Sequence, residues 1–87
     1  MFKEAFGRRL LEARTFRHDR ISQEALAFRA GVYRTQISLI ETGQRQPRLE
    51  TAVRLAGALD MSLSELLGPI RWEPGSPGSL CLGEEEA

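Results

Sequence analysis

Apolar residues recur at helical spacing along most of this chain. Near the N-terminus they follow one another at intervals of four, four and three, at Phe2, Phe6, Leu10 and Ala13. Such intervals place the four side chains on one face of a helix, which we expect to be buried. Charged residues fill the other faces. The pattern therefore predicts a first helix over residues 2 to about 17.

Residues 23–42 predict two short helices joined by a tight turn. Ser22 is a good N-cap for the first of them, which runs to about residue 29, and the second spans about 33 to 41. Gly31 supplies the left-handed or open backbone that the turn between them needs. Small or apolar residues stand where the two helices must touch: Leu26, Ala27, Ala30, Val32, Ile37 and Ile40. This is the pattern of a helix-turn-helix, whose natural partner is duplex DNA.

Two further helices complete an all-α, compact five-helix fold. Ser62 and Glu65 have the spacing of a capping box and open the last helix, which Gly68 and Pro69 end. Asp60, at the break before it, tolerates unusual backbone angles. The fourth helix carries a wide apolar face formed by Leu49, Ala52, Val53, Leu55, Ala56 and Leu59.

The composition changes at Glu73, where the sequence becomes EPGSPGSLCLGEEEA. Gly, Pro, Ser and acidic residues dominate this segment, and it offers little to bury. We therefore expect residues 1–72 to form one domain and residues 73–87 to form a disordered acidic tail.

The formal net charge of zero hides a division along the chain. All twelve Lys and Arg residues lie at or before Arg71, but only eight of the twelve Asp and Glu residues do. Residues 1–72 thus carry a formal charge of +4, and residues 73–87 carry −4. Because the local field attracts phosphate, the neutral total does not argue against a nucleic-acid partner.

Few residues offer catalytic or metal-binding chemistry. His18 is the only histidine and lies in a polar connector, and Cys81 is the only cysteine. There is no phosphate-binding loop and no carboxylate pair beside a nucleophile, so we expect no enzyme, no metal and no cofactor. No apolar run approaches the roughly 18 residues of a membrane span, and the N-terminus lacks a signal peptide's apolar core. We expect a cytoplasmic protein with no membrane partner.

Residues 6–68 resemble the phage lambda repressor and Cro family, also called the Xre-type helix-turn-helix family. The resemblance implies its five-helix fold and binding to double-stranded DNA. Tyr33 and Arg48 depart from the family pattern, because both stand where a small capping residue is common. The matching pieces are Gly7-Arg8-Arg9-Leu10, Ile21 to Ala27, Ala30-Gly31-Val32, Gln36-Ile37-Ser38, Ile40 to Gly43, Pro47, Leu49-Glu50-Thr51, Leu55 to Leu59 and Ser62 to Leu67.

The predicted recognition helix divides into an inner and an outer face. With Ile37 and Ile40 facing inward, the outer, base-reading face comprises Arg34, Thr35, Ser38 and Leu39. Arg34 is the best candidate for guanine, because its planar fork can donate to both O6 and N7. Gln23 matches a family position that holds a phosphate. The other residues expected near the DNA backbone are Tyr33, Gln36, Thr42, Gln44 and Arg45.

Two further expectations concern structure rather than base contact. The resemblance implies a partly buried ion pair between Arg14 and Glu41, which we expect to orient the recognition helix against the first helix. A homodimer would double the DNA site, with half-sites about one helical turn apart. The expected dimer surface comprises Leu63, Leu66, Ile70 and Trp72, and the alternative is that Ile70 and Trp72 fold back over their own domain.

The function that these features favour is a transcriptional regulator, a repressor that binds a palindromic operator as a homodimer. Three alternatives stay open: an antitoxin, a controller protein of a restriction-modification system, and a module of the same fold that serves protein–protein contact. A toxin or an anti-repressor is the expected protein partner, if there is one. DNA affinity measured against salt discriminates the contact module from the others, because phosphate contacts make binding fall steeply with salt.

Overall fold

The structure, a computed structural model, describes residues 2–16, 20–72 and 80–82. Its described part contains five helices, as the sequence predicts, followed by two short strands. The first helix ends two residues earlier than expected, and the other boundaries agree to within one residue. The elements are α1 (Phe2–Thr15), α2 (Gln23–Ala30), α3 (Arg34–Glu41), α4 (Leu49–Ala58), α5 (Leu63–Leu67), β1 (Ile70–Trp72) and β2 (Leu80–Leu82).

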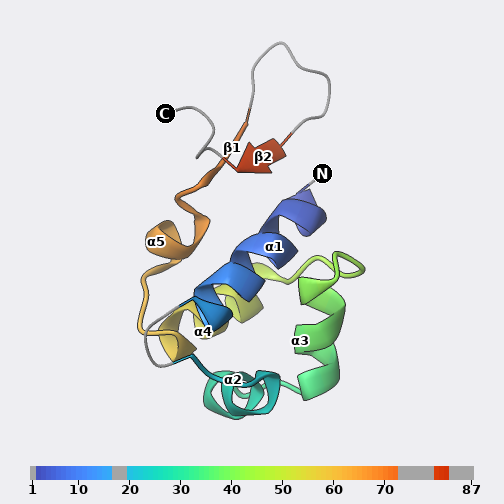
Figure 1. Cartoon of the computed structure of the whole chain (residues 1–87), viewed down its shortest axis with the longest axis vertical. Coiled ribbons are helices and arrows are strands. Elements are labelled where there is room, and N and C mark those ends of the chain that lie inside the picture. Colours follow the sequence, from blue (N-terminus) through green and yellow to red (C-terminus); the bar gives the residue numbers. More distant parts are fainter. Residues whose placement is uncertain (1, 17–19, 73–79, 83–87) are drawn as a thin grey trace.

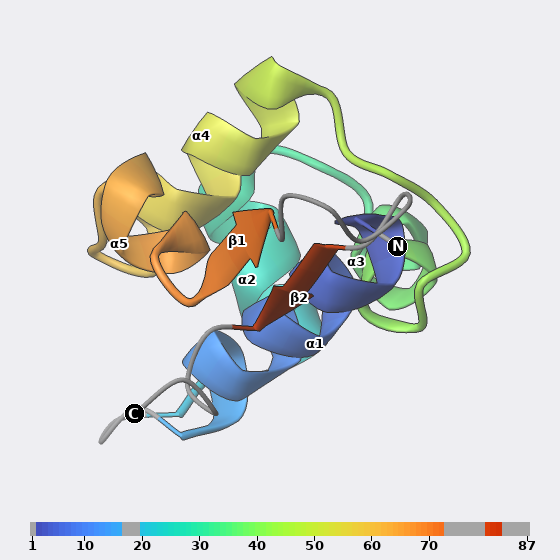
Figure 2. The same ribbon diagram turned by 90° about the horizontal axis from the view of Figure 1, so that it is seen from above.

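Helix α1 crosses the centre of the view in Figure 1, and the other helices lie beside, below and behind it. Helix α3 stands along one side, α2 crosses one end, and α4 lies behind α1. The two strands lie at the end opposite α2, and the view from above places them over α1 (Figure 2). This arrangement leaves α3 at the edge of the molecule.

The core lies where α1 meets the other helices. The predicted stripe of α1 is largely confirmed, because Phe6, Leu10 and Ala13 are buried, whereas Phe2 is half-buried and packs against the core. Each large side chain buried in this way contributes about 1.5–3 kcal/mol to stability. The side chains with less than 2 % of their surface exposed are Phe6, Leu10, Leu26, Ile37, Ile40, Leu55, Leu59 and Leu66.

The apolar face of α4 is narrower than the sequence predicts. Leu49 is 72 % exposed and Val53 is 50 % exposed. The helix packs against α2 and α5, and the two residues, four apart, form a line that faces away from both. The prediction that they belong to the buried face is wrong, whereas Ala52, Leu55 and Ala56 are buried as expected.

Three residues adopt a left-handed backbone at the breaks between helices. Gly31 has φ 72° in the turn between α2 and α3, and Gly43 has φ 78° after α3. Asp60 has φ 59° between α4 and α5 and is the non-glycine residue with positive φ in the described part. The left-handed backbone expected of Gly31 in the turn and the unusual backbone angles expected to be tolerated by Asp60 are confirmed.

Within the segment that the sequence predicts to be a disordered tail, Leu80–Leu82 form a short strand. This strand pairs antiparallel with Ile70–Trp72, with Arg71 opposite Cys81. Residues 73–79 and 83–87, on which the rest of the expectation falls, lie outside the described residues, as does His18. The pairing adds a small two-stranded sheet to an otherwise helical fold.

The described part contains no helix with the length and apolar character to cross a membrane. Within the same residues, no group of three His, Cys, Asp or Glu side chains is placed to hold a metal ion.

Candidate nucleic-acid interface

The two faces of α3 differ as the sequence predicts. Ile37 is 0 % exposed and Ile40 is 1 % exposed, so the inner face is sealed into the core. On the outer face Arg34 and Thr35 are exposed, whereas Ser38 and Leu39 are half-buried. The first turn of α3 therefore presents more free surface to a ligand than its second turn does.

The start of α3 is secured by Gln36 rather than by a small capping residue. Tyr33 occupies the N-cap position with an extended backbone, and its side chain makes no capping hydrogen bond. Instead the Tyr33 backbone N–H donates to Oε1 of Gln36 at 3.2 Å. Gln36 thus has a structural role that the sequence prediction lacks, and its amide nitrogen is the atom left for a phosphate. The Tyr33 side chain is 80 % exposed at the same end.

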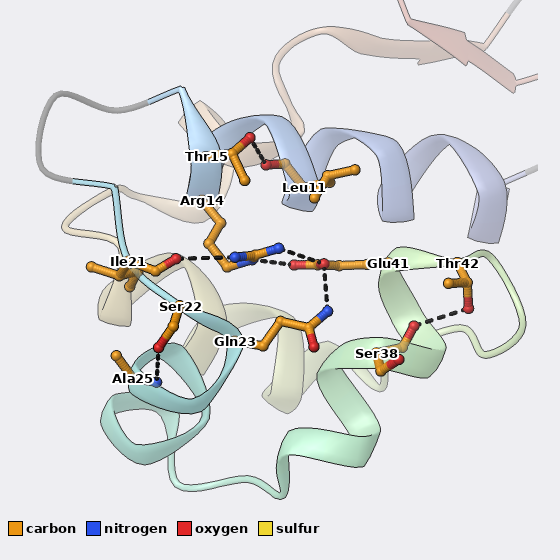
Figure 3. A network of polar contacts seen from close by, with 10 residues as sticks. All are labelled: Leu11, Arg14, Thr15, Ile21, Ser22, Gln23, Ala25, Ser38, Glu41 and Thr42. Carbon is orange, nitrogen blue, oxygen red and sulfur yellow. Dashed lines mark hydrogen bonds and ion pairs between the residues drawn. The ribbon is translucent and has the colours of Figure 1, made fainter.

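The predicted ion pair between Arg14 and Glu41 is present and links α1 to the end of α3. Arg14 donates from Nε to Glu41 Oε2 at 2.6 Å and from Nη2 to Glu41 Oε1 at 3.0 Å (Figure 3). The side chains are only 12 % and 4 % exposed, respectively. This two-point geometry fixes direction as well as distance.

Two further groups complete the network around this ion pair. The Arg14 guanidinium also donates from Nη1 to the backbone oxygen of Ile21 at 3.0 Å, in the segment that leads into α2. Gln23, the first residue of α2, donates from Nε2 to Glu41 Oε1 at 2.9 Å. Figure 3 shows the Glu41 carboxylate between the Arg14 guanidinium and the Gln23 amide. The predicted phosphate residue Gln23 is thus already engaged with the recognition helix.

A glycine allows α1 to approach the end of α3. Gly7 is buried, and a β-carbon built on it would overlap the backbone oxygen of Ile40. The same β-carbon would lie 3.0 Å from the backbone oxygen of Glu41. Only a residue without a side chain permits this closeness, which in turn brings Glu41 within reach of Arg14.

Hydrogen bonds order the residues that follow α3. Thr42 donates from Oγ1 to the Ser38 backbone oxygen at 2.9 Å, and Gln44 donates from Nε2 to Thr42 Oγ1 at 2.9 Å. Gly43 is buried between them, and Arg45 is exposed just beyond. The predicted phosphate residues Thr42, Gln44 and Arg45 therefore lie together on one ordered turn.

A shallow hollow brings two predicted contacts together at the other end of the interface. It is lined by Arg14, Ser22, Gln23, Glu24 and Arg34. The predicted phosphate residue of α2 and the predicted guanine reader of α3 thus share one depression. Ser22 caps α2 there by accepting from the Ala25 N–H at 3.0 Å, which confirms its predicted role.

The structure distinguishes arginines that bond to the protein's own backbone from arginines that remain exposed, a distinction that the sequence alone does not give. Arg9 donates to the backbone oxygens of Leu66 and Glu65 at the end of α5, and Arg29 donates to that of Ala58 at the end of α4. These are contacts to helix C-termini, where a positive charge is favourable. The exposed arginines with no hydrogen bond or ion pair among the described residues are Arg8, Arg20, Arg34, Arg45 and Arg48.

The expected dimer surface needs one correction. Leu66 is 0 % exposed and belongs to the domain's own core, so its side chain is not available to a second copy. Leu63 and Ile70 are half-buried and pack against the same core. Ile70 thus folds back over its own domain in part, as the alternative describes. Trp72 lies in β1, and its side chain is outside the described part.

Comparison with known proteins identifies a matching family and a similar crystal structure. The profile of the helix-turn-helix family matches residues 10–66. A crystal structure of the restriction-modification controller protein C.AhdI from Aeromonas hydrophila is 42 % identical, covers 75 % of this chain and 96 % of its own, and has a TM-score of 0.69. No curated protein matches the chain significantly.

Two structures of a competence regulator match the same part of the fold. ComR from Streptococcus vestibularis is 28 % identical over 78 % of this chain, with a TM-score of 0.70. ComR from S. thermophilus is 31 % identical over 76 % of this chain, with a TM-score of 0.67. In both, the match covers 22 % of the longer relative.

The family match, the identity to a controller protein and the exposed outer face of α3 all indicate the same kind of protein. This chain belongs to the Xre-type helix-turn-helix family and is a DNA-binding regulator.

Proposed function

We propose that this protein is a sequence-specific transcriptional repressor that binds a palindromic operator in double-stranded DNA as a homodimer. The observation that carries the proposal is the outer face of α3, where Arg34 and Thr35 are exposed while Ile37 and Ile40 seal the inner face. A helix anchored in this way can enter the major groove without rearranging the domain. Arg34 then reads a guanine through two hydrogen bonds, and Thr35 contacts an adjacent base.

Phosphate contacts on either side of α3 would fix its register. Tyr33 and Gln36 lie at the start of α3, Thr42, Gln44 and Arg45 follow its end, and Gln23 of α2 lies beside it, bonded to Glu41. Backbone contacts of this kind position a protein on the duplex but carry no sequence information themselves. The proposed interface therefore has a base-reading centre between two phosphate-binding ends.

The homodimer is proposed because one domain of this size reads few base pairs. A two-fold symmetric pair places two recognition helices about one helical turn apart and doubles the site. The surface we propose comprises Leu63, Ile70 and Trp72, with Leu66 left out because it is buried. Leu63 and Ile70 retain part of their surface for such a contact.

A second candidate function is that of a restriction-modification controller. The observation that favours it is the 42 % identity to C.AhdI, which this chain matches over 96 % of that protein's length. Such a controller is still a DNA-binding regulator, so the two candidates differ only in the genes under control. Occurrence of the bound sequence upstream of genes for a restriction enzyme and a methyltransferase would favour the controller, and its absence there would favour another regulon.

The experiment that tests DNA binding is a titration of the wild-type chain with duplex DNA at several salt concentrations. We expect the logarithm of the association constant to fall linearly with the logarithm of salt, since each neutralised phosphate releases counterions. Failure to bind any duplex at low salt would instead favour a module for protein–protein contact.

A further inference from the structure

The contact between Gln23 and Glu41 has a consequence for base recognition. We propose that Gln23 is a positioning residue in addition to holding a phosphate. Through Glu41 it fixes the position and orientation of α3 in the domain, and so it contributes to the choice of bases. This inference rests on the proposed DNA-reading role of α3. It begins from the 2.9 Å hydrogen bond that joins the first residue of α2 to the last residue of α3.

The carboxylate of Glu41 is the polar anchor of α3. It accepts two hydrogen bonds from Arg14 of α1 and one from Gln23 of α2, so three helices meet at one group. The placement works against the local preference of a helix, because a negative charge at a C-terminus opposes the helix dipole at a cost of about 0.3–1 kcal/mol. A residue that breaks a local rule in this way indicates a tertiary role.

The other contacts that hold α3 in place are less directional than the bonds to Glu41. Ile37 and Ile40 bury the inner face, but apolar contact is non-directional and resists rotation of the helix only through shape. The hydrogen bond between Tyr33 and Gln36 is local to the start of α3 and ties it to no other helix. The bonds to Glu41 therefore supply the directional constraint that sets where Arg34 points.

The chemistry of the Gln23 amide couples this anchor to the DNA backbone. A carboxylate accepts hydrogen bonds only, so the amide must turn its Nε2 toward Glu41, since the opposite orientation would set oxygen against oxygen. A phosphate is likewise an acceptor, and the same nitrogen has a second N–H for it. One NH₂ group thus bridges the phosphate and the anchor of the recognition helix, and it lies in the hollow that Arg34 also lines.

The test is the variant Gln23→Met, which keeps the length of the side chain but removes both donors. The probe is the duplex that the wild-type chain selects from a random pool, compared with the same duplex changed at the base pair that Arg34 reads. We expect the ratio of the two affinities to fall about three- to ten-fold, the range that one lost hydrogen bond spans. A residue that only holds a phosphate would weaken both duplexes equally. An unchanged ratio would therefore overturn the inference.

Two further variants make the result specific. Gln23→Lys retains a donor for Glu41 and for a phosphate, so we expect it to keep the wild-type ratio. A fall as large as that of the Met variant would contradict the proposed anchor. Gln44→Met makes the same substitution at another predicted phosphate residue, one whose amide bonds only Thr42 among the described residues, and should leave the ratio unchanged.

Hydrogen exchange of the free full-length protein gives a second readout that needs no DNA. We expect faster exchange of the α3 amides in Gln23→Met than in the wild-type chain, with circular dichroism confirming that both are folded. Equal protection of α3 in the two proteins would contradict the anchor. If the wild-type chain selected no duplex, the proposed function would fail. If it discriminated and Gln23→Met discriminated equally, only the present inference would fail.

Discussion

The space that a side chain at Gly7 would need is occupied by the backbone oxygen of Ile40. The contact holds α1 against the end of α3, and the Arg14–Glu41 ion pair joins the same two elements further along α1. The recognition helix is thus held by a glycine and an ion pair in addition to its apolar face.

Gly7→Ala should destabilise the protein. Alanine favours a helix over glycine by about 1 kcal/mol, but here the added methyl group must displace the backbone of α3. Such overpacking costs about 1–3 kcal/mol, and the contact with backbone leaves no flexible group to move aside. We expect a net loss of stability in urea unfolding, together with weaker DNA binding.

The matched control is Gly57→Ala in α4. A β-carbon there meets nothing within 4 Å, and Gly57 has an ordinary helical backbone. We expect a gain of about 0.5–1 kcal/mol, because only the helix propensity changes. If both alanine variants were stabilising, the close approach of α1 to α3 would be refuted.

Arg14→Met should cost more than a surface substitution. It leaves the Glu41 carboxylate, whose side chain is 4 % exposed, with Gln23 as its remaining partner in the network. Breaking a buried ion pair in this way costs about 3–5 kcal/mol, and we expect the lower end because Arg14 itself is partly exposed. The double variant Arg14→Met with Glu41→Leu removes both charges and should recover part of the loss. Equal stability of Arg14→Met and the wild-type chain in denaturant titration would show that the pair contributes nothing.

Arg34→Ala should relax base preference at one position of each half-site. The lost bidentate contact to guanine corresponds to about 1–3 kcal/mol of discrimination. Sequencing the DNA selected by the variant from a random pool measures this directly. Because Arg34 is exposed and has no partner among the described residues, stability should not change. A motif identical to that of the wild-type chain would exclude Arg34 as a reader.

Arg45→Ala should change DNA binding in a different way from Arg34→Ala. Its guanidinium lies on the turn after α3, where we place a phosphate contact, so affinity should fall for all sequences alike. The slope of affinity against salt should decrease by about one charge per bound chain. An unchanged slope with an altered motif would assign Arg45 to base reading instead.

The dimer surface is tested with Trp72→Ser. If Trp72 contributes to the proposed contact, sedimentation equilibrium should show a weaker dimer than that of the wild-type chain, and cooperative binding to a palindrome should decline. Phe16→Ser is the control, because Phe16 is 80 % exposed at the end of α1 and lies outside the proposed surface. If Phe16→Ser alone dissociated the dimer, the interface would instead lie at the end of α1.

Much of the fold follows from the spacing of apolar residues. The intervals at Phe6, Leu10 and Ala13 and at Ile37 and Ile40 identify the buried faces of α1 and α3, because a helix has only one face toward the core. Local chemistry predicts the breaks at Gly31 and Asp60, where the backbone is left-handed. These features depend on neighbours in sequence, and the sequence therefore reveals them.

Features that depend on distant neighbours could not be predicted in the same way. Leu49 and Val53 fit the apolar pattern of α4 but face outward, because burial depends on which elements pack against the helix. The strand Leu80–Leu82 forms by pairing with Ile70–Trp72, and three-residue strands carry almost no periodic signal. The contacts of Arg9 and Arg29 to helix ends, and that of Gln23 to Glu41, likewise join residues far apart in the chain.

The most direct test of the account is selection of duplex DNA from a random pool by the full-length wild-type chain. We predict one enriched motif with two-fold symmetry, its half-sites centred about one helical turn apart, and with a guanine whose preference disappears in Arg34→Ala. A pool that shows no enriched sequence, or an enriched motif that is the same for Arg34→Ala, would contradict the claim that the outer face of α3 reads base edges.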